Sequence, residues 1–215
     1  MRAAVFTGGP DIDIDRAACI AASCDVIYAA DGGADTALSA NVIPSKVIGD
    51  MDSISLETRS LLEKLSVPVE VFPVEKDMTD TELCINALPE DSEVVLISSF
   101  TGRPDHALSN IMMAVKMRSE GRDITVTDGK YDFIPLCGPD ELSIEGIQNP
   151  ESLAVSIIPF TRLSGVTAEG LYYKLDNAVL TPGSSLSVSN RIDAGKDSFS
   201  LKISEGQAGI VLSPL

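Results

Sequence analysis

The chain lacks tryptophan altogether and has a single histidine, four cysteines and no long apolar run among its 215 residues. The cysteines form no C-x-x-C pair, whereas a structural zinc site needs a closer cluster of ligands, so we interpret them as reduced thiols. A membrane-spanning helix needs roughly 18 to 20 consecutive apolar residues, and no segment approaches that length. The apolar stretch at the N-terminus is too short for a signal peptide. We therefore expect a cytoplasmic protein that has no membrane partner.

Basic residues are scarce, because 16 Lys and Arg stand against 32 Asp and Glu, which gives a formal net charge of −16. Nucleic-acid backbones attract clustered lysine and arginine, so this balance argues against a nucleic-acid partner. A strongly acidic surface suits divalent metal ions and cationic small molecules. Hydrophobic residues make up 44% of the chain, which is enough for a packed core.

Two common phosphate-binding motifs are absent. No G-x-x-x-x-G-K-[ST] loop occurs, which excludes a P-loop kinase, and no G-x-G-x-x-G follows the first apolar run, which disfavours a dinucleotide-dependent enzyme. Asp11, Asp13 and Asp15 alternate as at the start of an EF-hand, but Arg16 occupies the position that requires glycine. We therefore expect no calcium site in this segment.

The first half of the chain alternates between two patterns. Short apolar runs typical of strands occur at 3–7, 25–30, 46–49, 69–73, 94–99 and 124–127. Between several of them apolar residues recur at helical spacing, at Leu56, Leu61, Leu62 and Leu65, at Leu83, Ala87 and Leu88, and at Leu108, Ile111, Met112 and Val115. Strands that alternate with helices indicate βαβ units. We therefore predict the α/β class, with a Rossmann-like, mostly parallel sheet that carries helices on both faces, over residues 1–132.

After Tyr131 the helical period disappears. Short runs follow between Gly, Pro, Asn and Asp turn signals, at 132–136, 141–144, 153–159, 178–180, 186–189, 199–203 and 209–212. This spacing is typical of a small antiparallel sandwich or barrel. We predict such a second domain over residues 133–215.

Acidic residues follow the ends of the predicted strands in the first half. They are Asp31, then Asp50 and Asp52, then Asp77 and Asp80, then Asp105, and finally Asp128. In a parallel sheet the carboxyl ends of the strands share one edge, where ligands of open α/β folds bind. Carboxylates gathered there repel one another unless a cation neutralises them. Oxygen ligands suit Mg²⁺, so the sequence predicts a Mg²⁺ site at this edge.

Several of these residues also have a structural explanation when taken singly. Asp31 with its two following glycines forms a turn signal, and Thr79 with Glu82 matches a capping box that opens a helix. Asp80 would then be a favourable acid in the first helical turn, and Pro104 suits the first position of another helix. Only their joint placement at one edge favours a ligand site.

Cationic and main-chain groups at the same edge suit an anionic ligand. Lys76 and Arg103 are placed to neutralise phosphate oxygens. Main-chain N–H groups at residues 8–9 and 32–33 would add phosphate contacts. His106, the one histidine, is a candidate general base, but we favour a structural role at the start of its helix.

These motifs occur in the order found in one known family. They are Asp31-Gly32-Gly33-Ala34, Gly49-Asp50-Met51-Asp52-Ser53, Lys76-Asp77-Met78-Thr79-Asp80, Gly102-Arg103-Pro104-Asp105-His106, Asn177-Ala178-Val179-Leu180 and Gly183-Ser184-Ser185-Leu186-Ser187-Val188-Ser189-Asn190. The chain resembles thiamine pyrophosphokinases over nearly its whole length. The Gly-Asp-x-Asp-Ser and Asp-x-Thr-Asp pair is the most specific part of the resemblance.

The resemblance implies an enzyme, a thiamine diphosphokinase. Such an enzyme transfers diphosphate from ATP to the hydroxyl of thiamine with Mg²⁺, giving thiamine diphosphate and AMP. The resemblance further implies an ATP- and Mg²⁺-binding α/β domain (1–132) and a thiamine-binding β-sandwich (133–215). It also implies a homodimer whose active sites are shared between subunits.

The resemblance assigns roles to particular residues. The catalytic and metal-binding residues would be Asp50, Asp52, Asp77 and Asp80. The ATP-binding residues would be Asp31, Gly32, Lys76, Thr79, Arg103, Asp105 and Asp128. The thiamine-binding residues would be Leu186, Ser189 and Asn190. Some members of the family stack thiamine on a tryptophan, so in this chain an aromatic contact must come from phenylalanine or tyrosine.

Two other functions fit parts of the sequence. A pyrophosphokinase for a pterin alcohol would keep the same chemistry with another acceptor, although the segment 183–190 favours thiamine. A module that only senses Mg²⁺ or nucleotide would bind ATP without producing AMP, and the ordered aspartate motifs and the second domain argue against it.

Overall fold

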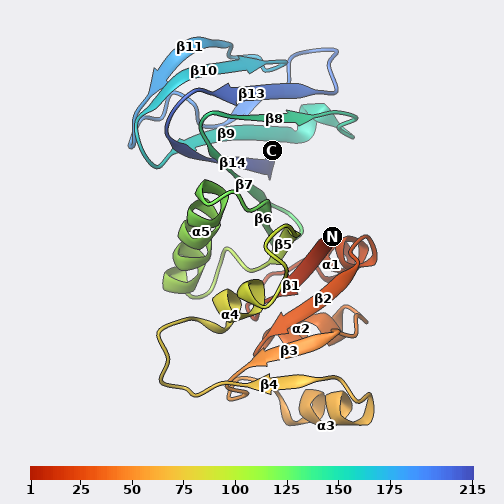
Figure 1. Ribbon diagram of the computed structural model, residues 1–215. Coiled ribbons are helices and arrows are strands. Elements are labelled where there is room, and N and C mark those ends of the chain that lie inside the picture. The colour runs from red at the N-terminus through yellow and green to blue at the C-terminus, as the bar shows by residue number, and fades with distance from the viewer. The chain divides into compact units, whose positions relative to one another are not determined.

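The computed structural model describes residues 1–215, which form two compact units. The first unit comprises Met1–Met113 and Arg122–Lys130, and the second comprises Ala114–Gly121 and Tyr131–Leu215. Figure 1 labels their helices and strands. None of the helices combines the length and the apolar character needed to cross a membrane.

A parallel sheet forms the centre of the first unit. Its strands are β1 (Arg2–Phe6), β2 (Val26–Ala30), β3 (Lys46–Gly49), β4 (Val69–Val71), β5 (Glu93–Ile97) and β6 (Ile124–Thr127). They lie in the order β6-β5-β1-β2-β3-β4, and every neighbouring pair is parallel. The strand order reverses at β1, which pairs with both β2 and β5, and open α/β sheets bind ligands beside such a point. The almost fully buried side chains of β1 and β5 explain why these runs are continuously apolar.

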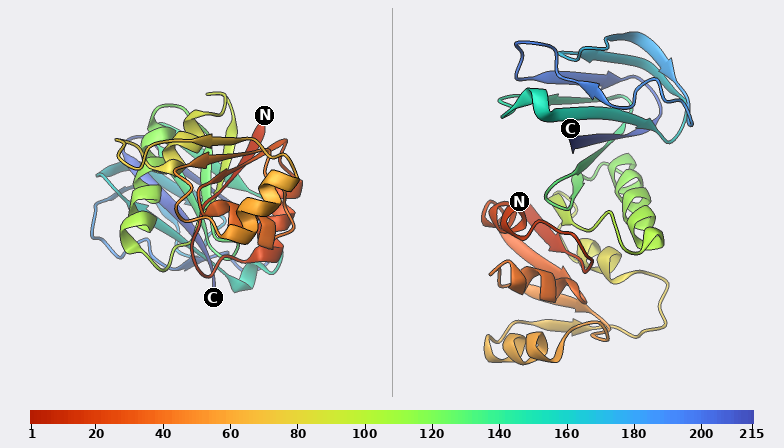
Figure 2. Two further views of the ribbon diagram at one scale, coloured as in Figure 1. Left: turned by 90° about the horizontal axis from the view of Figure 1, so that it is seen from below. Right: turned by 180° about the vertical axis from the view of Figure 1, so that it is seen from behind.

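Helices cover both faces of this sheet. They are α1 (Ile14–Ala22), α2 (Gly33–Ser39), α3 (Leu56–Lys64), α4 (Asp80–Asn86) and α5 (Pro104–Ser119), the last of which continues into the second unit. In both Figure 1 and the reverse view of Figure 2, α1 and α2 lie on one face and α4 on the other. The predicted α/β class is thereby confirmed.

Local signals place several helix starts. The Thr79 hydroxyl accepts a hydrogen bond from the Glu82 N–H at 3.2 Å, and Pro104 is the first residue of α5, as the sequence predicts. Leucine spacing did not indicate α1 and α2. The residues that both helices bury fully are small, such as Ala17 in α1 and Ala37 in α2, so the leucine spacing on which that prediction depends is missing.

The second unit contains two antiparallel arrays of strands. Its elements are β7 (Asp132–Cys137), β8 (Asp140–Ile144), the 3₁₀ turn η1 (Pro150–Ser152), β9 (Leu153–Pro159), β10 (Leu163–Glu169), β11 (Leu175–Leu180), β12 (Asn190–Arg191), β13 (Phe199–Ile203) and β14 (Gln207–Pro214). One array has the order β12-β9-β14-β7 and the other β11-β10-β13-β8. Fully buried side chains from both, among them Val155, Leu163, Leu201 and Ile210, share one core. The predicted antiparallel second half is confirmed.

The prediction of a strand at 186–189 is wrong, because this segment forms turns. The Leu-Ser-Val-Ser alternation imitates a strand, but only the Ile157 N–H pairs with its main chain, at the Ser187 carbonyl (2.8 Å), and serine hydroxyls make the other contacts to β9. The Ser187 hydroxyl donates to the Ile157 carbonyl at 2.7 Å, and the Ser189 N–H donates to the Ser156 hydroxyl at 2.9 Å. Ser189 has φ of 57°, which ends the extended backbone. The sequence analysis also missed β10, whose Ser, Gly and Thr residues dilute its apolar pattern.

An ion pair within the second unit carries a pH-dependent prediction. Arg118 donates from Nε and Nη2 to the Asp140 carboxylate, each at 2.9 Å, and the Cys137 N–H donates to the same group at 3.1 Å. Burial disfavours the charged carboxylate, but Arg118 and the main-chain donors outweigh this effect and lower the pKa of Asp140.

Because its pKa lies below the unfolded value of about 3.9, Asp140 contributes stability above that pH and loses it as the pH falls through the folded-state pKa. We expect Asp140→Asn to lower the free energy of unfolding by about 1–3 kcal/mol at pH 7. The difference from the unchanged chain should shrink below about pH 4. Urea unfolding of both proteins from pH 7 to pH 3 measures this, and a difference that stays constant would contradict it.

Candidate active site

A cavity of about 750 Å³ lies in the first unit, beyond the carboxyl ends of its strands. Segments that follow β1, β2 and β5 line it, together with the segment that leads into α4. The lining residues that sequence reasoning singled out are Gly8, Gly9, Asp31, Gly32, Lys76, Thr79, Asp80, Arg103 and His106. This is the crevice that the reversal of strand order beside β1 predicts.

Three carboxylates from different segments meet at this edge. Oxygens of Asp31, Asp50 and Asp80 all lie within 4.8 Å of one another. Asp31 is 8% exposed, and its Oδ1 is buried without a hydrogen-bond partner. A buried carboxylate oxygen without a partner is costly, so the site is suited to a cation that satisfies it.

The backbone brings these carboxylates together. The Asp31 N–H donates to the Ile48 carbonyl at 2.9 Å, which joins the end of β2 to β3. A side chain at Gly49 would place its Cβ 2.9 Å from the Asp31 Cβ, so only glycine permits this close approach. Asp80 comes from a third segment: it is the first residue of α4, and Thr79 caps the start of this helix.

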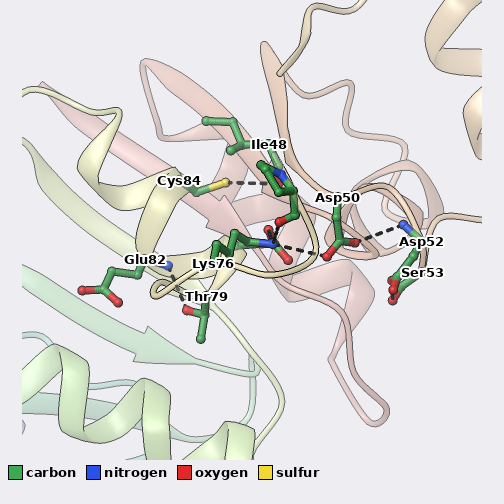
Figure 3. Close-up of polar contacts among 10 residues, drawn as sticks. Ile48, Asp50, Asp52, Ser53, Lys76, Thr79, Glu82 and Cys84 are labelled. Atoms are coloured by element: carbon green, nitrogen blue, oxygen red, sulfur yellow. Dashed lines mark hydrogen bonds and ion pairs between the residues drawn. The ribbon is translucent and has the colours of Figure 1, made fainter. Parts of the chain in front are cut away.

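The Lys76 ammonium lies between two of the carboxylates. Its Nζ is 3.2 Å from Asp50 Oδ2 and 3.1 Å from Asp80 Oδ1, and it also donates to the Pro73 carbonyl at 3.0 Å. Figure 3 shows this side chain reaching toward Asp50, which on its other side accepts the Asp52 N–H at 3.2 Å. The lysine therefore neutralises part of the cluster.

Charge interactions shift the pKa values within the cluster. Burial raises the pKa of Asp31, a hydrogen bond from Ser53 opposes that shift, and the charge of Asp50 adds to it. The main-chain N–H of Asp52 and then Lys76 hold the pKa of Asp50 below its usual value. Burial would lower the pKa of Lys76, but the carboxylates of Asp80 and Asp50 raise it. Lys76 and Asp50 are therefore both charged at neutral pH.

The donor set fits a hard divalent cation. It consists of carboxylate oxygens from three strand or helix ends, with no histidine or thiolate among them. Mg²⁺ binds through one or two carboxylates and completes its shell with water and phosphate oxygens. The unpartnered Oδ1 of Asp31 is the observation that favours occupancy by such an ion.

The other predicted residues of this edge are dispersed around the cluster. Asp52 is exposed and accepts a hydrogen bond from the Ser53 hydroxyl at 2.7 Å, and Asp77 is exposed as well. Arg103 pairs with Asp105 through Nη2 at 2.5 Å, with both side chains largely exposed. Asp128 is buried at the end of β6, where its Oδ1 accepts the Lys130 N–H at 2.8 Å.

A second cavity, of about 710 Å³, lies within the second unit. It brings together all three residues to which the resemblance assigns thiamine binding, Leu186, Ser189 and Asn190. Leu186 is 69% exposed, whereas Asn190 is buried. Tyr172 and Tyr173 line the same cavity, and the sequence analysis did not single them out.

Sequence reasoning also missed polar residues of the first cavity. Ser98 and Ser99 follow β5, and the buried Asn110 donates from Nδ2 to the Ser98 hydroxyl at 2.9 Å. The pair of serines at the end of an apolar strand was the available signal. The resemblance assigns Asp31 to ATP binding, whereas the position of Asp31 at a strand end predicts that it joins the carboxylates of this edge; its oxygens lie in the three-carboxylate cluster.

Comparisons with known proteins give consistent results. The family model "Thiamin pyrophosphokinase, catalytic domain" matches residues 18–126, and "Thiamin pyrophosphokinase, vitamin B1 binding domain" matches residues 147–206. The thiamine pyrophosphokinase of Bacillus subtilis is 35% identical over 173 residues, 79% of each chain.

Solved structures resemble the whole chain. The crystal structure of thiamine pyrophosphokinase from Bacillus subtilis superposes with a TM-score of 0.82 at 26% identity and covers 100% of both chains. Thiamin pyrophosphokinase from Candida albicans superposes with a TM-score of 0.80 and covers 100% of this chain and 90% of its own. At 17% identity, the latter likeness supports the fold alone.

Proposed function

This chain belongs to the thiamine pyrophosphokinase family, and we propose that it transfers the terminal diphosphate of ATP to the hydroxyl of thiamine in a Mg²⁺-dependent reaction. The hydroxyl oxygen attacks the β-phosphorus, the bond from that phosphorus to the α-phosphate oxygen breaks, and AMP leaves. The observation that carries the proposal is the three-carboxylate cluster with its buried, unpartnered Asp31 oxygen at the ligand crevice.

The aspartates of this edge have two roles in the proposal: most bind Mg²⁺, and one accepts the proton of the thiamine hydroxyl. Asp31, Asp50 and Asp80 would hold Mg²⁺, with Asp52 and Asp77 beside them. Bound there, the ion would neutralise charge on the phosphate oxygens. Asp77 is exposed and forms no hydrogen bond or ion pair, so its carboxylate is available to accept the proton that the thiamine hydroxyl loses.

The nucleotide contacts come from cationic side chains and main-chain donors of the first cavity. Lys76 and Arg103 line it and would pair with phosphate oxygens. The residues proposed to bind ATP remain Asp31, Gly32, Lys76, Thr79, Arg103, Asp105 and Asp128. Phosphoryl transfer depends mainly on positioning and charge neutralisation, which such a set of groups supplies.

The proposal also covers the roles of the two domains, the oligomeric state and the cellular localisation of the protein. We assign ATP and Mg²⁺ binding to residues 1–132 and thiamine binding to residues 133–215, in a cytoplasmic homodimer whose subunits share the active sites. Light scattering of the purified protein should give twice the chain mass of 22.7 kDa. A mass of one chain would contradict the shared-site arrangement.

The reaction is tested with purified protein, ATP, thiamine and Mg²⁺. We expect AMP and thiamine diphosphate to appear in equal amounts and both to disappear with EDTA. ATP binding without AMP production from a folded preparation would contradict the proposal and support a binding module. AMP production with a pterin alcohol but not with thiamine would change the acceptor and keep the chemistry.

A further inference from the structure

One peptide unit of the loop 50–53 is held at both of its ends. It joins Met51 to Asp52, and its N–H donates to Asp50 Oδ1 at 3.2 Å (Figure 3). Its carbonyl, that of Met51, accepts a hydrogen bond from Nη2 of Arg59 at 2.5 Å. Because a peptide unit is planar, the two bonds together fix its orientation. This orientation in turn sets the direction in which the Asp50 carboxylate faces.

The Asp50 carboxylate has one partner on each of its oxygens. Oδ1 accepts the Asp52 N–H, and Oδ2 lies 3.2 Å from Nζ of Lys76. A divalent cation bound in the three-carboxylate cluster would compete with Lys76 for carboxylate oxygens, whereas the Asp52 N–H is a neutral donor that a cation does not replace. This N–H is therefore the partner that keeps the carboxylate oriented when the cluster holds a cation.

The backbone of Met51 has a conformation that needs support from its surroundings. Its φ is 67°, in the left-handed region that residues with a Cβ rarely adopt. Such a conformation persists where the surrounding structure imposes it. The Met51 side chain packs against the core of the first unit, and the Arg59 guanidinium holds its carbonyl. Loss of the guanidinium would therefore free the peptide unit that follows.

The start of α3 gives Arg59 a fixed origin. The Asp35 carboxylate of α2 accepts the Ser55 N–H at 3.1 Å, the Ser55 hydroxyl at 2.5 Å and the Thr58 hydroxyl at 2.7 Å. Ser55 also caps the helix, because its hydroxyl accepts the Thr58 N–H at 3.1 Å. Thr58, which precedes Arg59, is buried. The exposed arginine side chain thus extends from a well-anchored helical turn to the loop.

We propose that Arg59 is a positioning residue for the cation site. Through the Met51 carbonyl it fixes the peptide whose N–H orients the Asp50 carboxylate toward a divalent cation. This inference rests on the proposed function, in which that cation is Mg²⁺. Arg59 lies outside the motifs on which the family resemblance depends, so it adds a residue to the site. Groups that orient a metal ligand change metal affinity without contact to the ion.

The direction of the effect separates positioning from a simple effect of charge. Arg59 is itself a cation, and removal of a positive charge beside an acidic cluster strengthens the binding of another cation. Loss of an oriented ligand weakens that binding. The two roles therefore predict changes of opposite sign when the guanidinium is removed.

The test measures Mn²⁺ binding to the metal-free chain from the electron paramagnetic resonance signal of the free ion. Arg59→Met removes the guanidinium and should weaken Mn²⁺ binding by about 10-fold. Arg59→Lys keeps the charge and one donor and should stay within about threefold of the unchanged chain. Lys64→Met is the matched control, because it removes an exposed positive charge from the same helix, outside both cavities. It should not weaken binding.

The Asp52 amide proton reports the positioning step directly. Its hydrogen exchange, followed by nuclear magnetic resonance, should be faster in Arg59→Met and unchanged in Lys64→Met, because only the first variant frees the peptide from the Met51 side. A role of Arg59 in stability alone would change urea unfolding but neither this exchange nor Mn²⁺ binding. Unchanged or tighter Mn²⁺ binding in folded Arg59→Met would overturn the proposal.

Binding and turnover together distinguish this inference from the proposed reaction. Turnover of thiamine by the unchanged chain, with Mn²⁺ binding unaffected in Arg59→Met, removes the inference and leaves the reaction. Weaker Mn²⁺ binding in Arg59→Met, without turnover of thiamine by the unchanged chain, supports the inference and removes the reaction. Absence of Mn²⁺ binding by the unchanged, folded chain overturns the inference whatever the activity.

Discussion

Asp50→Asn is expected to lower the rate of AMP and thiamine diphosphate formation by about two orders of magnitude or more, while the chain stays folded. Asp50 contributes an oxygen to the three-carboxylate cluster and pairs with Lys76 at 3.2 Å. An amide keeps the size of the side chain but loses the negative charge that both a divalent cation and this lysine require. Product formation is measured by chromatography at saturating ATP and thiamine.

Two comparisons make this result specific. Asp91→Asn removes a charge from an exposed turn of the same unit and should leave the rate unchanged. Asp52→Asn should also lose turnover with the fold intact, since we propose that Asp52 lies beside the bound Mg²⁺. Circular dichroism and urea unfolding establish that each variant is folded. Normal turnover of folded Asp50→Asn would exclude its proposed role.

Gly33→Ala is expected to destabilise the first unit by at least about 3 kcal/mol, enough to make much of the protein insoluble. A Cβ at Gly33 would lie 2.1 Å from the Phe6 carbonyl oxygen and 2.8 Å from the Thr7 Cα. Both are main-chain atoms at the end of β1, so no side-chain rotation relieves the overlap. The free energy of unfolding in urea, or the soluble fraction after expression, measures the effect.

The preceding glycine provides the matched control. A Cβ at Gly32 would meet the Ser53 carbonyl oxygen at 3.4 Å, an ordinary contact, and Gly32 has φ of −55°. Gly32→Ala should therefore change the free energy of unfolding by less than about 1 kcal/mol. Equal losses in the two variants would contradict the overlap with β1 as the reason that Gly33 must be glycine.

Much of the first unit follows from local rules. The apolar runs predicted at 46–49 and 124–127 have the same bounds as β3 and β6, and the Thr79 capping box correctly predicts the start of α4. The carboxyl ends of parallel strands share one edge of a sheet, and from this rule we predicted that the carboxylates after β2 and β3 lie at the same crevice, as they do. These predictions succeed because periodicity, capping and strand direction are properties of short segments.

The parts that the sequence did not reveal depend on packing between distant segments. The sequence predicts that these carboxylates share one edge, but it does not predict that oxygens of Asp31, Asp50 and Asp80 lie within 4.8 Å of one another, because that distance depends on the close approach of β2 and β3 at Gly49. Likewise, the hydrogen bonds between the Asn190 amide and the main chain of Tyr173 span 17 residues of chain. At 186–189 the Leu-Ser-Val-Ser alternation imitates a strand, although serine hydroxyls help to hold the segment in turns against β9.

The position of Lys76 has a consequence for how ligands enter the first cavity. Three carboxylates and one ammonium leave a formal charge of −2 on the cluster (−3 + 1), the amount that one divalent cation cancels. A divalent cation bound there would compete with the lysine for oxygens of Asp50 and Asp80, and its entry would release the ammonium to meet an anionic group. Uptake of cation and anion would then be thermodynamically linked, so each would strengthen the binding of the other by the same factor.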